Sequence, residues 1–168
     1  KEEHNEMLTL YLEEAEQREP APKGIKLFIS ASMLDDDDFL DLIEDCGGHI
    51  AADDMPTGSR YFFYPVEEHT EPLRALAERY LNKIACPRKM LPEKRQEFIE
   101  EVLEGIDVDG AIIHNLKACD CHLYEYPYLK AKLEEKGFPV LFFRGEETES
   151  ELETQRDDLE AFIEMLNS

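Results

Sequence analysis

Residues 25–30 read IKLFIS, a short and mostly apolar run that is typical of a buried β-strand. Three similar runs follow, at residues 49–54, 108–113 and 139–143. Apolar residues at helical spacing predict helices between and after these runs. One predicted helix begins at residues 35–38 and ends at 47–48, and others cover 69–83, 92–104, 124–136 and 149–166. Strands that alternate with helices predict βαβ units. We therefore expect an α/β fold with three layers, α/β/α, around a four-stranded parallel sheet of the Rossmann-like or flavodoxin-like kind.

The segment before the first strand predicts a separate helix. Met7, Leu8, Tyr11 and Leu12 recur at helical spacing within residues 1–18. Pro20, Pro22 and Gly24 then break the pattern, as prolines and glycines do between elements. We predict that residues 1–22 form an N-terminal connecting helix and that residues 23–168 form the α/β domain.

Composition limits the classes of function. The 168 residues fit one domain of ordinary size, and 42% apolar residues provide a real core. Only 18 Lys and Arg face 40 Asp and Glu, and the net charge of −22 disfavours nucleic acid and membrane surfaces as partners. No apolar run approaches the roughly 18 residues of a membrane span.

The start of the chain and its cysteines indicate the compartment. The chain opens KEEH, without Met and without a signal peptide. We interpret it as a mature product, a subunit of a split protein or a piece of a longer chain. Four cysteines without a secretory cue predict reduced thiols and a cytoplasmic location.

The loop after the third strand is the first candidate site, because ligands bind outside the carboxyl ends of parallel strands. His114, Cys119, Cys121 and His122 fall within nine positions there. Thiolates and imidazoles at such spacing bind soft or borderline metals, which leaves a zinc site open. In the alternative interpretation, Cys119 packs under the loop and Cys121 is an incidental thiol. Cys86 is a further ligand or a packing residue, and Cys46 is expected in or near the core.

The loop after the second strand is the other candidate. It offers hydroxyls, a flexible glycine and a fixed cation, namely Thr57, Gly58, Ser59 and Arg60. Such groups hold a thioester carbonyl or a phosphate by hydrogen bonds and charge. The alternative is a polar turn in which Arg60 neutralises Asp53 or Asp54. The chain has no Gly-x-Ser-x-Gly elbow, no Walker loop and no Gly-x-Gly-x-x-Gly, which disfavours nucleophilic catalysis and nucleotide binding of those kinds.

Several segments together resemble one known family. These are the opening KEEHNEML, CGGH at 46–49 with DDMPTGSRYF at 53–62, PLRALAERYL at 72–81 with Cys86-Pro87, VDG at 108–110 through KACD at 117–120, YPYL at 126–129, and EAFIE at 160–164. The chain resembles the C-terminal half of the 2-hydroxyacyl-CoA dehydratase D-component and benzoyl-CoA reductase subunit family. The similarity covers nearly all 168 residues in order.

The resemblance implies a cofactor and makes Cys119 its ligand. Subunits of this family bind a 4Fe–4S cluster through three cysteines, two from the N-terminal half and one from a loop after a C-terminal strand. Cys119 in KACD matches the third position, and Cys121 is a weaker alternative. On this basis residues 23–168 are the C-terminal domain of a longer, two-domain subunit, and the isolated chain is expected to be inactive.

The resemblance also implies partners and a reaction. A homologous second subunit pairs with the first, and an ATP-dependent iron–sulfur activator injects one electron. Water then leaves the 2-hydroxyacyl-CoA substrate by a radical elimination, and Thr57, Gly58, Ser59 and Arg60 are candidates for the substrate or subunit face. The alternatives are a benzoyl-CoA-type reductase subunit and a non-catalytic binding or assembly module that lacks the cluster.

Overall fold

The computed structural model describes residues 2–18, 24–34, 37–68, 71–84, 86–89, 92–145 and 149–168. The elements are α1 (Glu2–Gln17), β1 (Ile25–Ala31), α2 (Asp38–Asp45), β2 (Gly48–Asp54), α3 (Ser59–Phe62), α4 (Pro72–Leu81), the 3₁₀ helix η1 (Pro87–Lys89), α5 (Pro92–Glu104), β3 (Gly110–Leu116), α6 (Asp120–Glu135), β4 (Val140–Gly145) and α7 (Glu149–Leu166). Pro20, Pro22, Asp35 and His69, which carried sequence-based expectations, lie outside the described residues.

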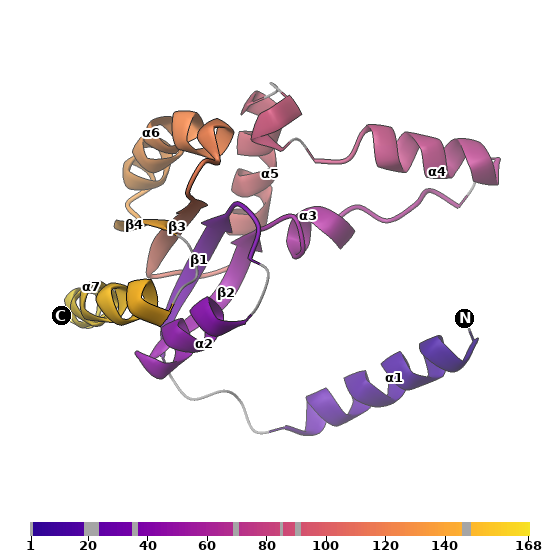
Figure 1. Cartoon of the computed structure of the whole chain (residues 1–168). Helices are drawn as coiled ribbons and strands as arrows, with labels where there is room; N and C mark the ends of the chain where they lie inside the picture. Colours follow the sequence, from indigo (N-terminus) through magenta and orange to yellow (C-terminus); the bar gives the residue numbers. More distant parts are fainter. Residues whose placement is uncertain are drawn as a thin grey trace.

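The four strands form one parallel sheet in the order β2-β1-β3-β4. Helices α2 and α7 cover one face, and α5 and α6 cover the other, as Figure 1 shows. The predicted three-layer α/β/α fold is confirmed. Strands β1 and β3 take the two central places, where both faces are covered, which explains why their sequences are nearly continuous apolar runs.

Two separate apolar clusters hold the layers together. On one face, Leu27 and Ile29 of β1 pack with Phe39 of α2 and Leu159 of α7. On the other face, Phe28 of β1 packs with apolar residues of α5 and α6. Because neighbouring residues of a strand point to opposite faces of the sheet, β1 contributes side chains to both clusters. The central strands β1 and β3 are therefore buried over most of their length.

Two helices extend away from these layers (Figure 1). Helix α1 has no buried residue, and α4 buries only Ala75. None of the described helices combines the length and the apolar character that a membrane span requires. The division of the chain at residue 22 stays a prediction.

The structure differs from the sequence-based expectation at three places near the sheet's carboxyl edge. Strand β3 was expected to end at Ile113 but continues to Leu116, because β4 pairs with it up to Gly145. Helix α6 begins at Asp120, four residues before the predicted start. The segment expected to be a loop contains the short helix α3.

Candidate functional site

The carboxyl edge of the sheet contains a topological switch point between β1 and β3. The two strands are neighbours, but the chain leaves β1 for α2 on one face and leaves β3 for α6 on the other. Such a divergence opens the crevice in which parallel α/β proteins bind ligands. The two loops are tied together here, because Ser32 N donates to His114 O at 3.1 Å and Leu116 N donates to Ser32 Oγ at 3.0 Å.

Cys119 lies at this switch point as the N-cap residue of α6. A tight turn places it there: Ala118 has a positive φ of 62°, and Cys119 N donates to Leu116 O at 3.2 Å. The side chain is half-buried and belongs to neither described core cluster. The partial positive charge at the start of a helix favours a negatively charged ligand at this position. A metal-bound thiolate carries such a charge.

The other members of the predicted metal cluster do not gather around Cys119. His114 is fully buried in β3, with its ring 4.5 Å from the ring of Phe39 on the α2 side of the sheet. His122 is buried in α6, on the opposite face, and Cys121 is exposed. Across the described part of the chain, no group of three His, Cys, Asp or Glu residues could hold a metal ion. The described residues therefore do not assemble the zinc site that the sequence left open, because the longer β3 carries His114 into the core.

Both histidines are neutral near pH 7. Burial lowers the pKa of His114 to about 4. Burial, with the nearby cations Arg95 and Arg60, lowers the pKa of His122 to about 3. Neither imidazole is poised to exchange a proton near neutral pH.

The remaining two cysteines, Cys46 and Cys86, are half-buried. Cys46 packs against the cluster on the α2 side, as expected, and burial raises the pKa of its thiol. Cys86 lines a cavity next to Arg60.

The loop after β2 folds around the carboxylate of Asp53. Asp53 Oδ1 accepts from Met55 N at 3.0 Å and from Ser59 N at 2.8 Å, and Oδ2 accepts from Ser59 Oγ at 2.7 Å. Gly58 is required by this close approach, since a Cβ there would collide with the Asp53 carboxylate. The Ser59 hydroxyl thus donates inside the loop, whereas Thr57 is exposed at its tip.

The second carboxylate, Asp54, is fully buried and pairs with Arg60. Arg60 Nε lies 2.9 Å from Asp54 Oδ1, and Arg60 Nη2 donates to Ala31 O at 2.8 Å and to Asp54 O at 3.0 Å. The interpretation in which Arg60 neutralises Asp54 is confirmed. Burial lowers the pKa of Arg60, and the Asp54 charge opposes that effect. Arg60 is only 3% exposed, so its main contacts are internal.

Two charged residues that were not predicted from the sequence, Arg95 and Glu125, complete this network. Arg95 of α5 forms ion pairs with Asp54 and with Glu125 of α6, and its Nη2 donates to Ser30 Oγ at 2.9 Å. Ser30 Oγ in turn donates to Asp54 Oδ2 at 2.9 Å. Two guanidinium groups and two carboxylates balance in charge, which limits the cost of burying them. The network joins β1, β2, α3, α5 and α6 directly beneath the carboxyl edge.

The spacing of apolar residues in the sequence indicates that Arg95 and Glu125 lie on the inward faces of their helices. Arg95 occupies the same helical face as Phe98, Ile99 and Val102, which are all buried. A charged residue within an apolar stripe indicates a buried partner, because an unpaired buried charge is very costly. Glu125 stands likewise at four-residue spacing before Leu129.

Comparison with known proteins gives consistent matches. The family model of the 2-hydroxyglutaryl-CoA dehydratase D-component matches residues 1–166. The (R)-phenyllactyl-CoA dehydratase beta subunit of Clostridium sporogenes is 30% identical over 168 residues, which is 99% of this chain and 45% of that protein. The lactoyl-CoA dehydratase subunit beta of Anaerotignum propionicum is 24% identical over 145 residues, 85% of this chain and 39% of that protein. The chain thus spans less than half the length of each curated relative.

Proposed function

The chain belongs to the 2-hydroxyglutaryl-CoA dehydratase D-component family, and from this premise we propose that it is the C-terminal, cluster-binding part of a 2-hydroxyacyl-CoA dehydratase subunit. The observation that carries the proposal is the position of Cys119. A half-buried thiol starts a helix at the switch point of a parallel sheet, the place where α/β proteins bind ligands, and a cofactor held there would lie between this domain and a second one.

The single thiolate of Cys119 fits a cluster whose remaining ligands come from another part of the subunit. Thiolates are the ligands that iron–sulfur clusters require, and Cys119 offers one thiolate at the edge. The described residues do not supply three ligands in one place. Two further cysteines would come from the N-terminal half of the subunit, as the family resemblance implies. Cys121, exposed on the first turn of α6, is the weaker candidate for the same role.

The cluster, when bound, would pass one low-potential electron to the acyl-CoA substrate, having received it from an ATP-dependent iron–sulfur activator. The chain's own residues position the ligand and form the rim. The Asp54–Arg60–Arg95–Glu125 network fixes α6 and the β2 loop against the sheet, so that Cys119 is held in place. Thr57, with Gly58 and Ser59 behind it, presents a hydroxyl toward the substrate or toward the homologous second subunit of a cytoplasmic dimer.

A non-catalytic binding or assembly role is the second candidate. It is favoured by one observation, that a single thiol stands at the switch point without two companion ligands among the described residues. The two proposals differ in whether the complete subunit holds iron and turns over substrate.

Activity of the complete subunit, purified without oxygen with its partner and activator, tests the dehydratase proposal. We expect 2-hydroxyacyl-CoA to be converted to the 2-enoyl-CoA only when the activator and ATP are present. Cys119→Ser should abolish turnover, and Cys121→Ser, a matched loss of one thiol two residues away, should largely spare it. Full turnover by the Cys119 variant, or no turnover by any form, would contradict the proposal.

A further inference from the structure

Positive charge is concentrated in one part of this acidic chain. Seven of the 18 Lys and Arg residues fall between residues 74 and 95, against only two acidic residues, Glu78 and Glu93. The seven are Arg74, Arg79, Lys83, Arg88, Lys89, Lys94 and Arg95. The segment runs through α4 and η1 into the first turn of α5. It carries a local excess of five positive charges in a chain whose net charge is −22.

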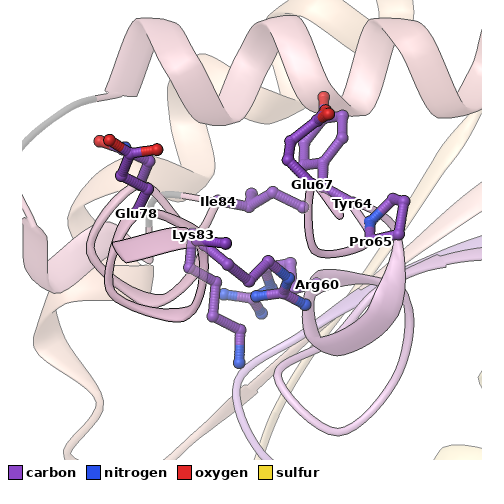
Figure 2. Close-up of a pocket in the computed structure, with 10 residues that line it drawn as sticks. Arg60, Tyr64, Pro65, Glu67, Glu78, Lys83 and Ile84 are labelled. Atoms are coloured by element: carbon purple, nitrogen blue, oxygen red, sulfur yellow. The ribbon is translucent and has the colours of Figure 1, made fainter. Parts of the chain in front are cut away.

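Two adjoining cavities lie against this segment. One, of about 360 Å³, lies between α4 and the residues that follow α3, and Arg60, Arg79 and Lys83 line it (Figure 2). The other, of about 230 Å³, shares Arg60 and Lys83 with the first and adds Lys89 and the ring of Tyr80. We call the two together the basic pocket. Figure 2 shows Arg60 and Lys83 close to each other in its centre.

Three cations of the basic pocket lack acidic partners among the described residues. No described carboxylate forms an ion pair with Arg79, Lys83 or Lys89. Arg79 donates to the carbonyl of Tyr61, and Lys89 Nζ donates to Leu81 O at 3.1 Å, so both are held in place by neutral groups. Lys83 Nζ lies 4.4 Å from the centre of the Tyr61 ring. An anion in the smaller cavity would meet Lys83 and Lys89, and Arg79 lines the adjoining larger cavity together with Lys83.

Two carboxylates, Glu67 and Glu78, line the larger cavity, and neither lines the smaller one. Glu78 Oε1 forms an ion pair with Arg74 Nε at 2.8 Å. The smaller cavity has no acidic side chain among its described lining residues. Burial, followed by the charges of Arg79, Arg60 and Lys89, lowers the pKa of Lys83, as expected where cations crowd together. A bound anion would relieve this repulsion.

We propose that the basic pocket binds the phosphate of a phosphorylated small molecule between Lys83 and Lys89, with Arg79 of the adjoining cavity adding positive charge nearby. Phosphate is the expected anion because it accepts several charge-assisted hydrogen bonds at once. Tyr80 and Ile84 offer apolar contact to the rest of the molecule. The volume of the cavities suits a small ligand rather than a protein surface. The two sources of such a phosphate are a coenzyme A thioester and a free adenine nucleotide. The inference does not depend on the role of Cys119.

Calorimetric titration of the full chain with coenzyme A, ADP, inorganic phosphate and pantetheine tests this site. We expect the phosphorylated probes to bind and pantetheine, which lacks phosphate, not to bind. Lys83→Glu and Lys89→Glu should each weaken binding about tenfold or more, because each removes a charge-assisted contact. Lys83→Gln should have a smaller effect in the same direction. Lys136→Glu is the control, since it makes the same charge change on an exposed residue at the far end of α6.

The titrations distinguish the two sources of the phosphate, a coenzyme A thioester and a free adenine nucleotide. Binding of coenzyme A well above ADP assigns the site to the coenzyme, and equal binding assigns it to a free nucleotide; either result supports a phosphate site. No binding of any phosphorylated probe, or equal losses in Lys83→Glu and Lys136→Glu, overturns it. A change of oligomeric state in the lysine variants without ligand binding also overturns it, in favour of an acidic protein partner. Absence of iron from the complete subunit would defeat the proposed function and leave these results unaffected.

Discussion

The carboxylate of Asp54 is the centre of the charge network under the candidate site. It is fully buried and contacts both Arg60 and Arg95. Removing one partner of a buried pair leaves uncompensated charge, which typically costs about 3–5 kcal/mol. We therefore expect Asp54→Ala to lower the free energy of unfolding by about that amount in urea titrations. The exposed Asp157→Ala should change it by less than about 0.5 kcal/mol. Equal stability of the two variants would contradict the network's structural role.

His114 predicts a pH dependence of stability. Burial lowers its pKa from the ordinary value of 6.5 to about 4 in the folded chain. Between these values the unfolded chain binds a proton at this residue and the folded chain does not, so stability falls as the pH drops from 6.5 toward 4. Neither ring nitrogen has a hydrogen-bond partner within the described structure. His114→Leu should therefore be nearly neutral at pH 7 and make the acid loss of stability shallower, as measured by urea unfolding between pH 7 and about pH 4.5. An unchanged slope would show that His114 does not contribute.

At the scale of residues, the sequence placed Cys119 and the β2 loop at the carboxyl edge but could not assemble their surroundings. Arg60 was correctly paired with Asp54 as one alternative, since the two are close in the chain. Arg95 and Glu125 come from other helices, 41 and 71 residues after Asp54 in the numbering. Pairing across such separations depends on how the helices pack, which local spacing does not encode.

At the scale of elements, apolar periodicity predicted the strands and the long helices because burial dictates that pattern. The predicted helices at residues 92–104 and 149–166 match α5 and α7 in both bounds. The end of β3 was wrong by three residues, because its last residues are specified by pairing with β4 rather than by their own pattern. His114 and Asn115 are polar, and polar residues that follow an apolar run are typical of a loop, so the pattern predicted that the strand ends before them.

A leucine-to-alanine substitution should lower the free energy of unfolding in a helix that packs on the sheet but not in a helix that extends into solvent. Leu133 of α6 is 1% exposed within the core, whereas Leu73 of α4 is 75% exposed. Leu133→Ala should lower the free energy of unfolding by about 2–5 kcal/mol, because it removes buried methyl groups and leaves a cavity. Leu73→Ala should change it by less than about 0.5 kcal/mol. Comparable losses of stability, measured by chemical denaturation, would contradict the exposed position of Leu73 on α4.

At the scale of the whole molecule, two apolar clusters on the two faces of the sheet account for the fold without a metal. We expect the circular dichroism spectrum and the thermal midpoint of the chain to be unchanged by a chelator. A domain whose metal is structural would unfold under the same treatment. Loss of helical signal after chelation would show that the cofactor stabilises this chain as well as serving the proposed chemistry.

Iron content tests the central claim most directly, because a ligand that is removed releases the metal whether or not activity can be measured. Iron and acid-labile sulfide should be quantified per subunit in the complete complex, purified without oxygen, for the unmodified protein, Cys119→Ser and Cys121→Ser. We predict that the Cys119 variant loses the cluster while the Cys121 variant retains it. Undiminished iron and sulfide in a correctly folded Cys119→Ser complex would contradict the assignment of Cys119 as the ligand.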